Sequence, residues 1–344
     1  MMNTSQKLIA LLSGAALLSV SSLTAQTATT APVGYVTTTT PTGDDTQIGV
    51  PLAQATALAS VADSVSDAVV TVSATLVANA YDNTHYVLAT SGANAGQWSE
   101  VVTTAANSIT TAEVLLAAGD TFEVIPFWTL ATAFPGGAGI AASANPSIPS
   151  SLILVNDLTA AGINLAPTGA YLYFAGPSPA PGFYSTTFAP SDDVRLTPET
   201  FVTIRNQSGS SIDSTFSGTV ATSVVGTTVV GVAGAAQDNL LVNPYPAPIT
   251  LANSGLTNVV ESSPNPSIPL DLVLIYDTSV VGVNQAPTGT YLHYAGPSPA
   301  AGWYSTTFQA SDNVEIPAGG AFIVRKGSGN DETLAWNPTL PYTL

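Results

Sequence analysis

The sequence predicts an all-β protein of tandem β-sandwich or jelly-roll-like domains, and three observations predict this fold class. Val, Ile, Thr, Tyr and Phe dominate the long segments, and strands favour these residues. The 28 Gly and 25 Pro residues interrupt those segments at short intervals, as turns between short strands do. In addition, a long stretch of the chain occurs twice, which indicates an internal duplication of one structural unit.

The repeated stretch begins at Asn145-Pro-Ser-Ile-Pro149 and again at Asn265-Pro-Ser-Ile-Pro269, 120 positions later. The register then holds without a gap for roughly 65 residues, which is far longer than one coil of a β-solenoid. Many short strands at this spacing are typical of a sandwich or barrel-like all-β fold. We therefore expect each copy to form its own sheet-containing unit.

Each copy contains the same expected elements in the same order. An apolar strand leads to an Ala-Pro-Thr-Gly turn, in which Pro fixes φ and Gly supplies a positive-φ position. A Tyr-rich strand, a Gly-Pro-Ser-Pro-Ala loop, an aromatic pair and a last strand follow. The expected strands are residues 152–155, 171–174 and 201–205 in the first copy, and 272–275, 291–294 and 321–325 in the second.

We expect four parts in the chain: a signal peptide (1–25), an N-terminal β domain with a degenerate copy of the repeat (26–130), repeat unit 1 (131–217) and repeat unit 2 (218–344). The degenerate copy is indicated by Ala118-Gly-Asp-Thr-Phe122, which is similar to Ala318-Gly-Gly-Ala-Phe322. A second similarity joins Asp45-Thr-Gln-Ile-Gly-Val-Pro51 to Asp238-Asn-Leu-Leu-Val-Asn-Pro244, and 56–59 to 249–252.

The N-terminus has the features of a cleaved secretory signal. Lys7 precedes an apolar run over residues 8–18 that is too short to span a bilayer, and small residues lead to an expected cleavage after Ala25. No later stretch reaches transmembrane length without polar interruption. The chain has no cysteine, so stability must come from burial without disulfides. We expect the mature protein to be extracellular, on the cell surface or in the periplasm.

The charge of the chain excludes several classes of partner. Five Lys and Arg residues stand against 22 Asp and Glu, giving a net charge of −17. Nucleic-acid binding depends on cationic side chains that neutralise phosphates, so no nucleic-acid partner is expected. Anionic membrane surfaces would repel the chain for the same reason. The expected partners are other copies of the chain or cell-surface components, with a polysaccharide as the alternative.

Three places in the chain carry a resemblance to a known family. They are Thr29-Thr-Ala-Pro-Val-Gly-Tyr-Val-Thr37 with Asp45-Thr-Gln-Ile-Gly-Val-Pro-Leu52, Gly119-Asp-Thr-Phe-Glu-Val-Ile125 leading to Trp128-Thr-Leu-Ala131, and the Tyr-strand and Gly-aromatic pattern of the repeats. On these motifs the chain resembles a family of exported proteins found as many paralogues in verrucomicrobial bacteria, with no assigned function. The resemblance implies export and an all-β fold, and it supplies no catalytic residues.

The sequence shows no motif for catalysis or for a transition metal. His85 and His293 are the two histidines, and no nucleophile elbow, phosphate loop or His/Cys cluster is present. A carboxylate pair such as Asp157 with Asp192 could serve glycoside hydrolysis, but its spacing is unspecific. We therefore expect no enzyme. Calcium is the metal that oxygen ligands alone could bind, at Asp157, Asp192, Asp277 and Asp312, although Asp is also an ordinary turn residue.

The aromatic pairs after the proline-rich loops are the remaining candidate site. Phe183, Tyr184, Trp303 and Tyr304 could stack on a sugar, or one ring of each pair could pack in the core. The leading hypothesis is an exported structural or cell-surface protein that assembles by β-strand addition through Val33–Thr40 or through residues 334–344. The alternative is an extracellular carbohydrate-binding protein that uses the aromatic loop residues.

Overall fold

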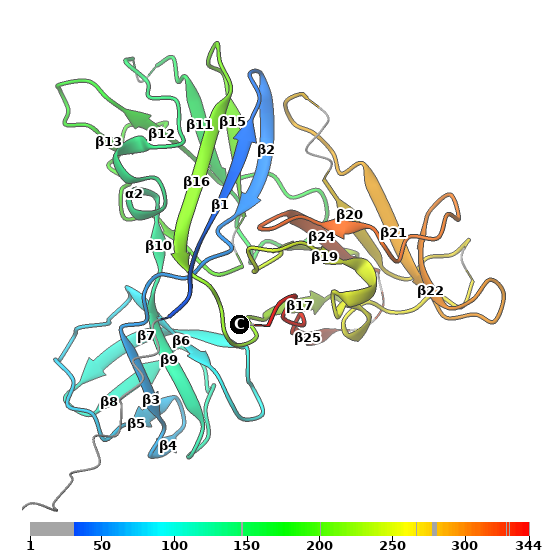
Figure 1. The fold of residues 1–344 in the computed structure, drawn as a ribbon, viewed down its shortest axis with the longest axis horizontal. Coiled ribbons are helices and arrows are strands. Elements are labelled where there is room, and N and C mark those ends of the chain that lie inside the picture. The colour runs from blue at the N-terminus through cyan, green and yellow to red at the C-terminus, as the bar shows by residue number, and fades with distance from the viewer. Residues whose placement is uncertain are drawn as a thin grey trace, which may run out of the picture. The chain divides into compact units, whose positions relative to one another are not determined.

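The computed structural model describes residues 31–343 except 146, 200, 266, 277–280, 328 and 330, so the expected signal peptide lies outside the described residues. The described chain is almost entirely β, as the sequence predicts. Its strands form two five-stranded sheets, one seven-stranded sheet and four two-stranded sheets (Figure 1). No helix of the described residues has both the length and the apolar character needed to cross a bilayer.

The first five-stranded sheet belongs to what we call module 1, which is formed by β1, β2 and β10 to β16. The strand order of this sheet is β13 (Gly182–Ser185), β12 (Gly169–Phe174), β11 (Ser151–Val155), β15 (Phe201–Asn206) and β2 (Asp44–Gly49). All neighbours are antiparallel. Two short sheets complete the module, β1 (Val33–Thr40) with β16 (Ile212–Thr219) and β10 (Trp128–Thr129) with β14 (Arg195–Leu196).

Module 2, formed by β17 to β25, has the same strand order as module 1. Its large sheet is β22 (Gly302–Ser305), β21 (Gly289–Tyr294), β20 (Leu272–Ile275), β24 (Ala321–Lys326) and β18 (Gln237–Val242). Its short sheets are β17 (Thr227–Gly231) with β25 (Glu332–Trp336) and β19 (Ile249–Thr250) with β23 (Glu315–Ile316). The sequence repeat therefore corresponds to two sheets of equal topology.

A seven-stranded sheet occupies the chain between β2 and β10, and we call it the intervening sheet. Its order is β3 (Leu58–Val61), β9 (Thr121–Pro126), β6 (His85–Ala89), β7 (Trp98–Ala105), β8 (Ser108–Thr111), β5 (Val69–Thr71) and β4 (Ser64–Ser66). Asp45 and Asp238 pair with Arg205 and Arg325 in equivalent ladders, yet the aspartates are 193 residues apart and the arginines 120. Module 1 therefore has 73 additional residues (193 − 120), and all but one of them lie between β2 and β10, in the segment that forms the intervening sheet.

The expected domain boundaries fall inside hydrogen-bonded sheets. β1 and β2 precede the boundary at 130/131 but pair with β16 and β15, which follow it. The boundary at 217/218 lies within β16, which ends at Thr219. The expected similarity of 56–59 to 249–252 was wrong, because the counterpart of Thr250, which caps the 3₁₀ turn η2 (Leu251–Asn253), is Thr129, which caps helix α2 (Leu130–Ala133).

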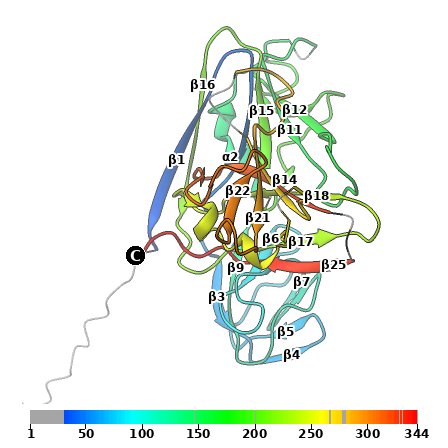
Figure 2. The same cartoon turned by 90° about the vertical axis from the view of Figure 1, so that its right-hand side faces the viewer.

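Each module buries its core between its large sheet and its short sheets, as Figure 2 shows for β1 and β16 beside β15 and β11. In module 1, Ile153 and Ile204 from the large sheet pack with Phe216 from β16 and Phe134 after α2. Every second residue of β16 from Ile212 to Phe216 is buried, as expected for a strand with one face on a core. Module 2 places Trp336 where module 1 has Phe216, so the same layer holds a larger ring.

The two modules are joined by an ion pair that reaches across to a loop of the other module. Arg205 of module 1 donates from Nε and Nη2 to the two carboxylate oxygens of Asp45, at 2.8 and 2.7 Å. The same Nη2 donates to Oδ1 of Asn284 in module 2, and the Asn284 N–H donates to Asp45, at 2.6 and 2.7 Å. Asp45 is buried, so its charge depends on these donors.

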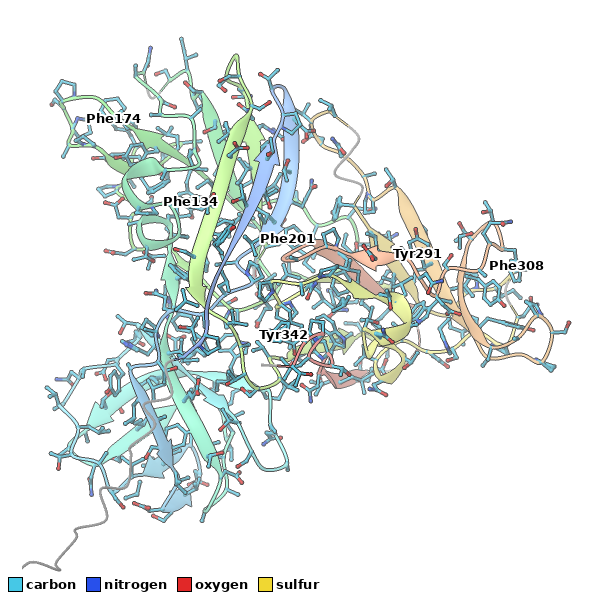
Figure 3. The ribbon with its side chains drawn as sticks, viewed as in Figure 1. Phe134, Phe174, Phe201, Tyr291, Phe308 and Tyr342 are labelled. Atoms are coloured by element: carbon cyan, nitrogen blue, oxygen red, sulfur yellow. The ribbon has the colours of Figure 1, made fainter. Side chains whose placement is uncertain are left out.

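Module 2 repeats this arrangement in the opposite direction. Arg325 binds both carboxylate oxygens of Asp238 at 2.6 and 2.9 Å, and its Nη2 donates to Oδ1 of Asn164 in module 1 at 3.0 Å. The Asn164 N–H donates to Asp238 at 2.7 Å. We call the two sets together the reciprocal clasp. Apolar residues, including Phe201, Leu240 and Leu274, lie between the modules beside it, and Phe201 is central in Figure 3.

Glu199 lies where both modules meet the intervening sheet. The indole N–H of Trp98 in β7 donates to its carboxylate, and Thr227 in β17 contributes a further side-chain hydrogen bond. Tyr86, Trp98 and Phe127 form an aromatic cluster that packs on Val225 next to it. Burial raises the pKa of Glu199 to about 7, although the hydrogen bonds from Trp98 and Thr227 act to lower it.

We expect Arg325→Met to lower the free energy of unfolding by about 3 kcal/mol, because it leaves a buried carboxylate without its cation. Asp238 is only 2% exposed. The matched control is Arg195→Met, which removes the partly exposed pair with Glu100 and should cost at most about 1 kcal/mol. Urea unfolding measures both, and equal losses would contradict a special role for the clasp.

We expect Glu199→Gln to change how stability depends on pH. A carboxyl whose folded-state pKa is raised stabilises the fold fully below its ordinary pKa, and this contribution is lost as the pH rises through about 7. The free energy of unfolding of the variant relative to the parent should therefore rise by about 3 kcal/mol between pH 4.5 and pH 8. Glu315→Gln, at an exposed position, is the control. A constant difference between variant and parent would show that Glu199 does not titrate in this way.

Candidate functional site

The first ring of each expected aromatic pair lies in a core. Phe183 is 1% exposed and packs against Tyr173 and Phe134, with ring centroids 5.2 and 6.3 Å apart. Trp303, its equivalent in module 2, is 2% exposed and packs against His293 at 5.2 Å. The faces of both rings are covered by other side chains of the chain.

The second ring of each pair holds the proline-rich loop. The hydroxyls of Tyr184 and Tyr304 donate to the carbonyls of Ala180 and Ala300, at 2.8 and 2.9 Å. Tyr184 stacks on Phe188, with centroids 4.8 Å apart, and Tyr304 stacks on Phe308 at 5.5 Å. Figure 3 shows Phe308 and Phe174 far from Phe201, at the outer ends of their modules. Tyr184 is buried in module 1. In module 2, Tyr304 and Phe308 are both partly exposed, so solvent reaches these two rings.

The acidic residues considered for calcium act within turns. The N–H and hydroxyl of Thr159 both donate to the exposed Asp157, and these bonds lower the pKa of Asp157. Asp192 and Asp312 accept the N–H of Phe183 and of Trp303, each at 2.8 Å, and so fix the starts of β13 and β22. Asp277 lies outside the described residues. Within the described ranges, no group of three or more His, Cys, Asp and Glu is arranged to hold a metal ion.

The histidines make short contacts with neighbouring hydroxyls. Nδ1 of His85 lies 2.8 Å from the Thr84 hydroxyl, and Nδ1 of His293 lies 2.7 Å from the Ser262 hydroxyl. Burial lowers the pKa of both imidazoles. Sequence reasoning missed the pairing of Ser262 with His293, because the two residues are 31 positions apart and belong to no motif. Neither residue lines the groove described next.

A groove of about 350 Å³ lies between module 1 and module 2, beside β1. Residues of β1 and β2 form one side, Tyr276 forms a wall, and the turn before β24 forms the other side. The lining residues are Val36, Thr37, Thr38, Thr39, Gln47, Ile48, Tyr276, Pro317, Ala318, Gly319, Gly320 and Ala321. None of these side chains carries a charge at neutral pH, and most are small.

β1 presents an unpaired edge along this groove. The N–H of Val220 donates to the carbonyl of Pro32 at 2.8 Å, which sets the alternation of the ladder with β16. The main-chain groups of Val36 and Thr38 therefore face β16, and those of Thr37 and Thr39 point to the other edge. In the described part of the chain no strand pairs with that edge.

The edge of β1 also lacks the protection that natural edge strands have. Its eight residues include no charge, no proline and no bulge, which are the features that normally prevent edge pairing. Val33 and Tyr35 are 76% and 77% exposed. This edge therefore carries none of the chemical features that would stop it from pairing with another extended chain.

Gln47 is a largely buried polar residue in the lining of the groove. It is 8% exposed, and no hydrogen bond joins its side-chain amide to another described residue, so the amide meets the solvent of the groove. The equivalent position in module 2 is Leu240, since Gln47 and Leu240 pair with the equivalent residues Thr203 and Ile323. The amide is thus a feature of module 1 that the shared backbone does not require.

Comparison with protein-family models, with curated proteins and with solved structures finds no match for this chain.

We expect Trp303→Phe to change the free energy of unfolding by no more than about 1.5 kcal/mol, because module 1 has Phe183 at the equivalent core position. The indole N–H of Trp303 is buried without a partner among the described residues, so its loss removes no hydrogen bond. Trp303→Ala should cost about 3–5 kcal/mol through the cavity it leaves. Thermal unfolding and a polysaccharide pull-down together check this. Selective loss of sugar binding with unchanged stability would instead assign Trp303 to a carbohydrate site.

Proposed function

We propose that this protein is an exported structural or cell-surface protein that assembles by accepting an extended strand along β1. One observation carries the proposal: an uncharged strand edge, with which no strand of the described residues pairs, borders a groove whose lining side chains are mostly small and all neutral. Strand addition gains affinity from main-chain hydrogen bonds and gains selectivity from the pockets beside the strand. Export is supported by the N-terminal sequence, with its Lys7, apolar run and small residues.

In this proposal Val33–Thr40 accepts a strand, and the C-terminal stretch is no longer a strand donor. Val33–Thr40 was expected to donate a strand, but it is already paired along its whole length with β16, so it can act as an acceptor. The C-terminal stretch was the other expected donor. Its strand β25 is paired with β17, Trp336 is 1% exposed, and the Tyr342 hydroxyl donates to the Ala221 carbonyl at 3.1 Å. That stretch belongs to the fold of module 2.

We expect Thr37→Pro to weaken self-association of the mature chain by at least about tenfold, equivalent to 1.4 kcal/mol. Proline removes an N–H of the free edge and leaves the ladder with β16, which uses the alternate residues. Thr37→Val is the matched control. It also loses the hydroxyl contact with Thr215, but it keeps the N–H.

Sedimentation velocity over a range of concentrations measures the association, and electron microscopy shows whether filaments form. Thr37→Val should associate within about threefold of the parent, because the main-chain donor that strand addition uses is unchanged. The proposal would be rejected if the parent chain is monomeric at all concentrations, or if Thr37→Pro associates as well as Thr37→Val does.

A further inference from the structure

We propose that the strand accepted beside β1 is the N-terminal arm, residues 26–32, of a neighbouring copy of this chain. The inference rests on the proposed function and names its partner. The arm has the sequence Gln26-Thr-Ala-Thr-Thr-Ala-Pro32. It directly precedes β1, and six of its seven residues come before the first proline, so they can extend as a β-strand.

The chemistry of the arm matches that of the groove. The arm carries no charged side chain, and its largest residue is one glutamine. The groove is equally neutral, and its wall Ala318-Gly319-Gly320-Ala321 carries no side chain larger than a methyl group. For a chain with a net charge of −17, an uncharged contact also avoids the repulsion between copies that acidic segments would cause.

Gln47 supplies the polar group that an incoming main chain needs. A primary amide carries a donor and an acceptor side by side, so it can bind the N–H and the C=O of an extended peptide. Gln47 is nine-tenths buried and lines the groove with its amide unpartnered. The amide atoms of Gln47 are not among the buried atoms that lack a partner, so they meet the solvent of the groove, where an incoming main chain can take the place of water.

The chain's own arm is too short to fill its own groove. Pro32 still belongs to the ladder with β16, so the chain can reverse only before it. With a two-residue turn at residues 30 and 31, residue 29 would face Pro32 and residue 24 would face Thr37. Cleavage after Ala25, as the sequence predicts, removes residue 24. An arm from a second copy is not bound by this register and can reach Thr37 and Thr39.

Such an exchange would join copies head to tail. The donor surface (the arm) and the acceptor surface (the groove) are different, so the contact is heterologous. An open assembly keeps a free arm at one end and a free groove at the other until a ring closes. The expected assemblies are therefore open chains or rings of copies, which agrees with a structural role outside the cell.

Peptide binding tests the occupant directly. We compare the mature chain with a chain that begins at Pro32, and we titrate a labelled peptide of residues 26–32 into the shortened chain. The shortened chain should be monomeric and should bind the peptide, whereas a peptide with Thr29→Pro should bind at least about tenfold more weakly, because it lacks one main-chain donor and the extended geometry.

Gln47→Leu provides the matched variant within the groove. Leu is the residue of module 2 at the equivalent position, and the substitution removes an amide without a partner. The melting temperature should therefore change little, while peptide affinity should fall at least about tenfold. Equal peptide affinity in Gln47→Leu and parent would overturn the role of Gln47 and of this groove.

Cross-linking decides whether the arm comes from another copy, because the chain has no cysteine of its own. A copy with Thr29→Cys is mixed with a copy that carries Ala318→Cys in the groove wall, and Ala301→Cys in an exposed loop of module 2 is the control. A disulfide between copies that forms with position 318 and not with position 301 supports the proposal. A disulfide inside a single chain carrying both substitutions would overturn it in favour of the chain's own arm.

The outcomes separate this inference from the proposed function. If the chain that begins at Pro32 assembles as well as the mature chain, and Thr37→Pro abolishes that assembly, the edge of β1 is an acceptor but the arm is not its occupant. If neither chain assembles and no peptide binds, both proposals are rejected.

Discussion

The reciprocal clasp is the interaction on which the rest of the arrangement depends. Each arginine binds a buried aspartate of its own module and an asparagine on a loop of the other module. All four Lys and Arg side chains among the described residues are in ion pairs, so no spare cation could replace one of them. The clasp binds the two modules to each other. The groove depends on this contact, because β1 of module 1 forms one side and the turn before β24 of module 2 forms the other.

The differences between the modules matter more for function than their similarity. Gln47 faces the groove where module 2 has Leu240, and Gly319 lines the groove where module 1 has Glu199. The side-chain amide of Asn206 donates hydrogen bonds to three main-chain carbonyls. Its counterpart Lys326 is buried and forms ion pairs with Asp271 and Glu332. The shared backbone therefore forms part of a neutral groove at Gly319. At the equivalent position of module 1, it carries Glu199, an acid that contacts the intervening sheet.

Several candidate residues make structural contacts for a common reason. Without disulfides, large rings must supply much of the buried apolar surface, and short strands need side chains that fix their first N–H groups. Phe183 and Trp303 do the first, and Asp192 and Asp312 do the second. Their recurrence at 120-residue spacing therefore reflects the demands of the fold. The groove was not visible in the repeat pattern, because its lining differs between the modules.

The all-β class, the common succession of elements in the two repeated segments and most of the repeat's strands could be predicted from the sequence, because alternation and turn chemistry are local properties. The sequence similarity of residues 45–51 to 238–244 also corresponds to a structural equivalence, because these residues form most of β2 and β18. Three features became visible only in the folded chain: β1 and β2 join strands more than 150 residues later, Asn164 and Asn284 bind arginines of the other module, and one edge of β1 has no partner strand among the described residues. These features depend on contacts between distant segments, and nothing in the local spacing of residues specifies such contacts.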